Sequence, residues 1–111
     1  MRQNKVLSLL GIAAKGGNVV SGEQQTLNAI RNKSAFLVFI AVDASANTEK
    51  LFTDKCSFHE VAVCKFGSKE GLGRAIGKGD RSSLAICDKG LAQALTKQIE
   101  RDAAQTAEWR E

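Results

Sequence analysis

The sequence has no proline, one histidine and three cysteines, and each shortage excludes a kind of structure or chemistry. Because proline is absent, no helix is broken by a proline, and no central strand is excluded by one. Cys56, Cys64 and Cys87 are odd in number and lack Cys-x-x-Cys spacing, which argues against a disulfide framework and against a zinc site. We therefore expect three buried thiols and no bound metal.

Long apolar runs and cofactor-binding loops are also absent. No stretch is long enough to cross a membrane, and the apolar residues 6–10 are interrupted by Ser8 and followed by Gly11, unlike a secretory signal. No Gly-x-x-x-x-Gly-Lys-Ser/Thr loop or dinucleotide fingerprint occurs. The sequence thus predicts a cytoplasmic protein with no membrane partner and no cofactor.

The residues that are present are typical of one soluble domain. The chain has 111 residues, of which 43% are hydrophobic and 25% charged, and it is too short for two independent cores. Apolar residues at helical spacing alternate with short apolar runs rich in β-formers. We expect helices around residues 6–13, 27–30, 51–56, 72–76 and 91–99, and strands at 19–20, 36–42, 61–64 and 84–87.

This alternation predicts an α/β fold, namely a single-domain three-layer α/β/α sandwich with a small mixed four-stranded sheet. The run 36–42 is apolar throughout, as expected of a central strand covered on both faces. Residues 1–101 are expected to form the domain, and residues 102–111 a polar C-terminal tail or an extension of the last helix. Ser21 and Gln24 form a capping-box pattern before the second helix, and Ser68 and Asp88 are expected to cap later helices.

Positive charge is concentrated in two separate stretches of the chain. The formal net charge is +4, and residues 1–34 alone sum to +4 while residues 68–90 sum to +2. Such a balance permits a polyanionic partner without requiring one, since scattered surface charge is equally compatible with it. We predict that the fold brings the two stretches together around the start of the second helix, with Gly22 and Lys69 on the same side of the molecule.

One segment has a specific pattern. Residues 68–77 read SKEGLGRAIG, a serine-lysine pair followed by Leu-Gly, a basic residue and Ala-x-Gly. This closely resembles a motif of the kink-turn-binding family of ribosomal protein L7Ae and its L30e, S12e and Gadd relatives. The resemblance continues, in order, through residues 20–23, 37–42, 43–48, 53–56 and 85–90, which a chance motif match would not do.

The resemblance implies an RNA-binding protein that recognises the kink-turn, a sharply bent internal loop between two stems. In the family, the start of the second helix meets guanine edges, and the loop after the fourth helix packs against an extruded nucleotide. Structured RNA is the expected partner, with the ribosome as one candidate host and no role for DNA. The expected RNA-binding residues are Gly22, Glu23, Gln24, Gln25, Asn28, Ser45, Lys69, Lys78, Gly79, Arg81 and Ser82.

The sequence also departs from the family pattern. Gln24 and Gln25 stand where archaeal members carry Asn-Glu, and Asn28 stands where most members carry lysine. The loop 79–83 is more polar than usual, and Asp80 would repel phosphate. Gln24 has a possible capping task, whereas Gln25 and Asn28 are expected to have no local partner and so to face the RNA.

Two other functions fit parts of the sequence. One is a protein-interaction module of a translation complex that has lost kink-turn specificity. The other is a small phosphotransfer enzyme, in which Asp43 and Asp88 after strands, with Asp54, form a carboxylate pocket. A further catalytic hypothesis is that Cys56 acts as a nucleophile with His59 as its base. However, no third residue that would orient the histidine is identifiable.

Overall fold

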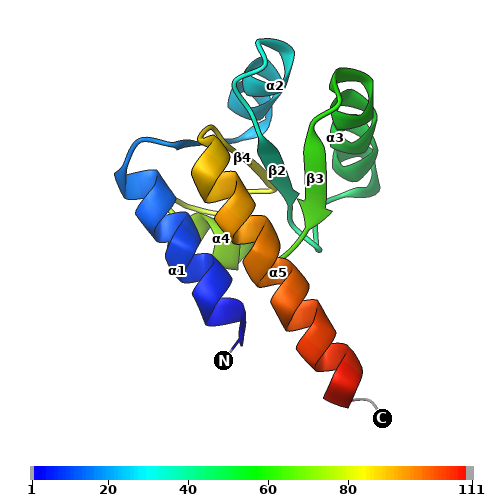
Figure 1. Cartoon of the computed structure of the whole chain (residues 1–111). Coiled ribbons are helices and arrows are strands. Elements are labelled where there is room, and N and C mark those ends of the chain that lie inside the picture. Colours follow the sequence, from blue (N-terminus) through cyan, green and yellow to red (C-terminus); the bar gives the residue numbers. More distant parts are fainter. Residues whose placement is uncertain (1, 110–111) are drawn as a thin grey trace.

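The computed structural model describes the backbone of residues 2–109 and the side chains of residues 5–102. Within this range, helices and strands alternate along the chain as predicted (Figure 1). The elements in chain order are α1 (Arg2–Lys15), β1 (Val19–Ser21), α2 (Glu23–Arg31), β2 (Leu37–Ile40), α3 (Ala46–His59), β3 (Ala62–Lys65), α4 (Lys69–Ala75), β4 (Ser83–Ile86) and α5 (Lys89–Trp109).

The four strands form one mixed sheet in the order β1-β4-β2-β3. β2 pairs with β3 in parallel, and β4 runs antiparallel to both of its neighbours, β1 and β2. In the centre of the sheet, Val38 lies opposite Ala85 on one side and Val63 on the other. The predicted mixed four-stranded sheet is confirmed.

Helices cover both faces of the sheet because alternate residues of each strand point to opposite sides. On one face Leu37 and Phe39 pack in a core with residues of α1, α4 and α5, and on the other face Val38 and Ile40 pack with α2 and α3. Figure 1 shows the same division, with α1, α4 and α5 on one side of the strands and α2 and α3 on the other. The three-layer α/β/α prediction is therefore confirmed.

Three helices begin at the same edge of the sheet. β1, β2 and β3 run in one direction, because β1 and β2 are both antiparallel to β4 and β3 is parallel to β2. Each of these strands is followed within a few residues by a helix, so the starts of α2, α3 and α4 lie at their carboxyl ends. Ligands of open α/β sheets usually bind at this edge.

The element boundaries differ from the expected ones by a few residues. The run 36–42 is a strand only over β2, because its neighbours are four residues long, and Phe36 and Val42 are 44% and 58% exposed. Cys56 is buried as expected, whereas Cys64 and Cys87 are only partly buried. The last helix continues past residue 101 as far as Trp109, and residues 110 and 111 lie outside the described part.

Candidate nucleic-acid interface

Helix α2 begins without a side-chain cap. Its N-cap residue is Gly22, which has φ 90° and ψ 161°, a backbone conformation that favours glycine. The predicted capping box is wrong, because Ser21 is the last residue of β1 and its hydroxyl accepts a hydrogen bond from Arg81 at 3.0 Å. Gln24, the other half of the expected box, donates to Asn28 instead.

The first backbone donors of α2 are consequently unoccupied. The Gly22 N–H donates to the Ser83 carbonyl at 3.1 Å, and the Thr26 N–H makes the first helical bond, to the Gly22 carbonyl at 3.0 Å. In the described part of the chain, no acceptor meets the N–H groups of Glu23, Gln24 or Gln25. These donors, with the positive end of the helix dipole, are suited to bind acceptor groups of a partner.

The starts of α3, α4 and α5 are different, since side chains already satisfy them. In each case an oxygen of a serine or aspartate accepts a hydrogen bond from a backbone N–H in the first turn. The expected caps are confirmed for α4 and α5, and α4 has a second one. The capping residues are Ser45 on α3, Ser68 and Asp43 on α4, and Asp88 on α5.

The exposed face of α2 carries an amide pair and one free amide. Gln24 donates through Nε2 to Oδ1 of Asn28 at 3.0 Å, so Asn28 does have a local partner, contrary to the sequence-based expectation. The reason is the i, i+4 spacing, which places the two side chains next to each other on the helix surface. Gln25 is exposed, and no hydrogen bond of its side chain occurs among the described residues.

The loop between α4 and β4 is fixed by backbone contacts. The N–H of Lys78 donates to the Gly73 carbonyl at 2.8 Å, and the N–H of Arg81 donates to the Lys69 carbonyl at 3.0 Å. Gly73 is buried against Gly79, and a Cβ at position 73 would collide with the Gly79 backbone. The loop that is expected to meet RNA is therefore held in one conformation before any ligand binds.

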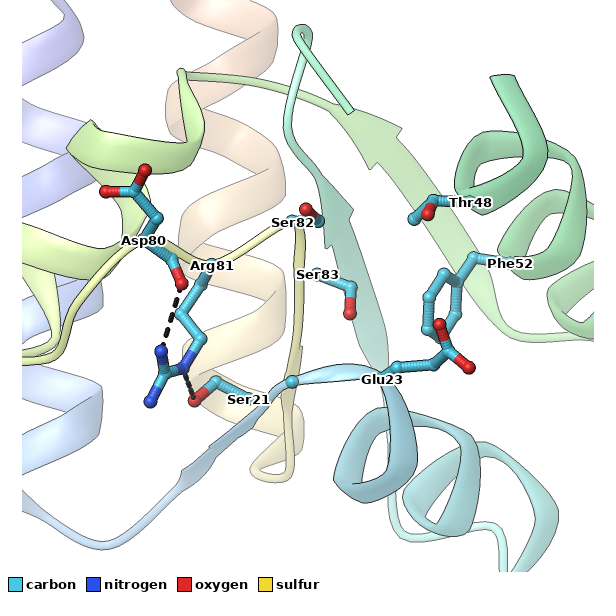
Figure 2. A pocket seen from close by; sticks show the side chains of 9 residues that line it. Ser21, Glu23, Thr48, Phe52, Asp80, Arg81, Ser82 and Ser83 are labelled. Atoms are coloured by element: carbon cyan, nitrogen blue, oxygen red, sulfur yellow. Dashed lines mark hydrogen bonds between the residues drawn. The ribbon is translucent and has the colours of Figure 1, made fainter. Parts of the chain in front are cut away.

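The side chain of Arg81 joins this loop to β1. Its Nε donates to the Ser21 hydroxyl and its Nη1 to the Asp80 carbonyl, both at 3.0 Å (Figure 2). Nη1 also donates to the Gly79 carbonyl at 3.4 Å. Arg81 thus contacts Ser21, next to Gly22, through its side chain and Lys69 through its backbone. The two stretches predicted to meet do lie side by side.

The sequence predicted only an RNA contact for Arg81, but this residue also stabilises the loop. We expect Arg81→Lys to keep the charge but lose the guanidinium fork that bonds Ser21 and two carbonyls, lowering the free energy of unfolding by about 1–2 kcal/mol. Urea denaturation measures this loss. Lys78→Arg, at an exposed position in the same loop, serves as the control and should leave stability unchanged. Equal stability of both variants would mean that Arg81 does not hold the loop.

A pocket of about 270 Å³ opens between the start of α2, the end of this loop and α3. Its lining comes from three separate segments of the chain, namely residues 21–23, helix α3 and residues 80–83 (Figure 2). The sequence-based site did not include Thr48 and Phe52. Phe52 has the spacing of a core residue, and its side chain is indeed fully buried. The lining residues are Ser21, Gly22, Glu23, Thr48, Phe52, Asp80, Arg81, Ser82 and Ser83.

The expected site residues Ser45, Lys69, Lys78 and Gly79 do not line this pocket. Ser45 caps α3 and donates to the Thr48 hydroxyl at 3.0 Å. It therefore contacts a residue that lines the pocket. Lys69 is partly buried at the start of α4, and Lys78 and Gly79 are exposed in the loop. The pocket, the α2 start and the loop together form what we call the α2–loop surface.

The catalytic alternatives have no support in the geometry. Asp43 caps α4, Asp88 caps α5 and Asp54 pairs with Lys50 at 2.9 Å, so the three carboxylates serve separate tasks. Burial raises the pKa of the Cys56 thiol to about 11, which keeps it protonated at neutral pH and inactive as a nucleophile. Among the residues that the structure describes, no group of His, Cys, Asp and Glu side chains could hold a metal ion.

A second hollow, of about 550 Å³, lies along α5 at the opposite end of the sheet. Phe36 precedes β2, whose start pairs with the end of β4, whereas the α2–loop surface adjoins the end of β2. This groove therefore does not belong to the α2–loop surface. Its lining residues are Phe36, Lys89, Ala92, Gln93, Thr96, Lys97 and Glu100.

Over the described residues, no helix is both long and apolar enough to span a membrane.

Comparison with known proteins confirms the resemblance. The chain belongs to the ribosomal protein L7Ae/L30e/S12e/Gadd45 family, which matches residues 4–96. RNA-binding protein YlxQ of Bacillus subtilis (strain 168) is 46% identical over 87 residues, spanning 78% of this chain and 87% of that protein. The family and this relative are not enzymes, and neither is this chain.

Solved structures of similar proteins share the fold. A protein with unknown function from Bacillus halodurans C superposes with a TM-score of 0.83 at 38% identity, covering 86% of this chain and 97% of that one. The 15.5kD RNA binding protein of Giardia lamblia superposes with a TM-score of 0.75 at 23% identity, covering 93% of this chain and 88% of that one. The α/β fold described above is thus shared with these proteins.

Proposed function

We propose that this chain is a cytoplasmic RNA-binding protein that recognises kink-turns in structured RNA through the α2–loop surface. The observation that carries the proposal is the uncapped start of α2 beside the fixed loop 78–82, in a protein whose α3, α4 and α5 are all capped by side chains. The unpaired backbone N–H groups at the start of α2 can donate to an exposed base edge or to the bent backbone of an RNA.

The geometry of this surface favours binding of a widened internal loop of RNA over binding of a regular RNA duplex. An A-form helix has a major groove too narrow for side chains to read, whereas splayed bases present their edges and fit a pocket. Gln24, Gln25 and Asn28 carry amides that donate to and accept from base edges, and Lys69 and Lys78 supply positive charge for phosphate. A host RNA in the ribosome is compatible with family membership and is part of this proposal.

A gel-shift titration tests the function. A kink-turn RNA and a straight duplex of equal length are titrated at the same salt concentration. The proposal predicts tighter binding of the kink-turn by several kcal/mol, on the order of a thousandfold. Equal affinity would contradict it and would favour the protein-interaction module instead, because charge alone does not distinguish the two RNAs.

Asn28 offers a test of the docking orientation. Asn28→Lys should tighten kink-turn binding severalfold and steepen the dependence of log affinity on log salt by about one unit, the effect of one added phosphate contact. The lost Gln24–Asn28 hydrogen bond is exposed and contributes only a few tenths of a kcal/mol, about 0.2–0.5. Gln93→Lys adds the same charge on α5, in the distant groove, and should change neither quantity. Unchanged or weaker binding by Asn28→Lys would count against the proposed orientation.

A further inference from the structure

Four loops meet at the edge of the sheet opposite the α2–loop surface. β1, β2 and β3 begin at this edge and β4 ends there, because β4 is antiparallel to β1 and β2. The Cys87 N–H donates to the Asn18 carbonyl at 2.8 Å, and hydrogen bonds thus join two of the loops. The Phe36 N–H donates to the Ile86 carbonyl, also at 2.8 Å. We call this region the amino edge, and its loops are residues 16–18, 32–36, 60–61 and 87–88.

The amino edge carries positive charges that have no ion-pair partner. Four basic side chains lie in its loops or at the helix ends beside them, and all four are exposed. Within the described part of the chain, none of them makes an ion pair or a side-chain hydrogen bond. Among the described residues of the four loops, Glu60 is the only exposed acidic one, since Asp88 is half-buried and caps α5. The four basic residues are Lys15, Arg31, Lys33 and Lys89.

Helix stability explains two of these charges but not the other two. Lys15 and Arg31 lie in the last turns of α1 and α2, where a cation is favourable beside the negative end of the helix dipole. Lys89 is the first residue of α5, where the dipole disfavours a cation. Lys33 has φ 64°, a left-handed conformation that favours glycine or asparagine over lysine. The backbone positions of Lys33 and Lys89 therefore disfavour lysine on structural grounds.

The two exposed phenylalanines of the described chain lie at the same edge. Phe58 is in the last turn of α3 and is 80% exposed, and Phe36 precedes β2 and is 44% exposed. Phe36 lines the groove along α5 together with Lys89. Phe58 ends a helix that packs beside α2, whose last residue is Arg31. Each exposed ring thus has a basic side chain of a neighbouring element at its own end of the fold.

We propose that the amino edge binds an unpaired, single-stranded segment of RNA, in addition to any RNA at the α2–loop surface. Exposed rings stack with bases of any identity, while lysine and arginine contact the phosphates, and this combination is typical of single-strand binding. The bases of a duplex are stacked on one another and leave no face for the rings. The protein then holds two RNA segments at opposite edges of its sheet. The inference requires RNA but not a kink-turn, so it is tested separately from the proposed function.

A labelled oligouridine of about ten nucleotides tests the site. The salt concentration is held at about 0.1 M, at which charges more than about 10 Å apart are largely screened. The oligouridine should bind more tightly than a duplex of the same length, and saturation with unlabelled kink-turn RNA should change its affinity by less than about threefold. Displacement by the kink-turn RNA would overturn the inference, because both RNAs would then share the α2–loop surface. Equal affinity for the duplex would overturn it as well, since stacking on the rings needs unpaired bases.

Phe58 allows a test of the stacking contact. Phe58→Leu keeps an apolar side chain but removes the ring, so it should weaken oligouridine binding at least about fivefold, the lower end for one stacked base. Phe58→Tyr is the matched control, which keeps the ring and should bind within about twofold of the wild type. Both variants should remain as stable as the wild type, because the side chain is 80% exposed. Equal affinity of Phe58→Leu and Phe58→Tyr would contradict the stacking role.

The two lysines without a structural explanation allow a test in which stability and affinity change in opposite directions. Lys33→Gly combined with Lys89→Gln should be at least as stable as the wild type, since glycine suits φ 64° and α5 loses a cation at its start. Its oligouridine affinity should nevertheless fall at least about fivefold, and the salt slope should decrease by about 0.7 for each lost phosphate contact.

The matched control removes the same charge elsewhere. Lys5→Gln combined with Lys50→Gln changes exposed positions that lie roughly 13–15 Å along α1 and α3 from the amino edge. This control should leave the oligouridine affinity within about twofold of the wild type. If the two double variants lose affinity equally, the loss reflects net charge and the inference is overturned.

The outcomes separate this inference from the proposed function. If a kink-turn outbinds a duplex while the Phe58→Leu and lysine variants bind oligouridine like the wild type, the inference fails and the proposed function stands. If these variants lose oligouridine binding while no kink-turn outbinds a duplex, the inference stands and the proposed function fails.

Discussion

Replacing Gly73 with alanine should lower the free energy of unfolding by about 3 kcal/mol. Gly73 lies inside α4, where alanine in place of glycine would ordinarily stabilise an exposed helix by about 1 kcal/mol, so the expected sign is the opposite of the helix-propensity effect. The reason is that a Cβ at this position would fall on the backbone of Gly79, and backbone cannot rotate out of the way as a side chain can. Urea denaturation measures the change.

Gly79 provides the control for this contact. A Cβ on Gly79 would meet nothing within 4 Å, and its φ lies outside the left-handed region, so Gly79→Ala should leave stability within about 0.5 kcal/mol of the wild type. Because Gly73 also accepts the hydrogen bond from Lys78, its replacement should displace the loop and weaken kink-turn binding as well. A stable Gly73→Ala protein with unchanged affinity would mean that the loop is not held against α4.

Gly22→Ala should weaken kink-turn binding by about tenfold to a hundredfold, the cost of one or two lost base contacts. It should also destabilise the protein by about 1–3 kcal/mol, since φ 90° with ψ 161° is strained for any residue with a side chain. No atom lies within 4 Å of the position a Cβ would take, so the methyl group projects into open space at the N-cap of α2. Affinity is measured on protein shown to be folded by circular dichroism.

Gly17→Ala separates the two effects. Gly17 also has a positive φ, of 76°, and open space around it, but it lies after α1 at the other end of β1. Its replacement should cost about 1–2 kcal/mol of stability and leave the affinity for a kink-turn unchanged. If the two alanine variants lose affinity equally, the loss at Gly22 reflects strain in the protein and not contact with RNA.

The helices, strands and layers were predictable because they depend on apolar periodicity, which local sequence displays. The run LVFI of β2 is buried at every position, as its composition suggested. Ser68 and Asp88 were correctly identified as caps, because each lies within a few residues of the N–H group that it accepts from.

The features that were missed depend on contacts between distant residues. The capping box at Ser21 was wrong because Arg81, sixty residues away, takes its hydroxyl. Nor does a single sequence reveal that Asp43 caps α4, which begins twenty-six residues later. Local sequence patterns locate the helix starts. Which of these starts lacks a side-chain cap depends on contacts between residues that are distant in the sequence.

The central claim is that RNA meets the α2–loop surface, and amide shift mapping tests it most directly. ¹⁵N-labelled protein is titrated with a kink-turn RNA, and the change of each backbone amide signal is recorded. We expect the largest changes at Glu23, Gln24 and Gln25 and in the loop 78–82, where the unpaired donors and the pocket lie. If the largest changes instead fall on Phe36 and the lining of the α5 groove, while the α2 amides stay unchanged, the claim is contradicted.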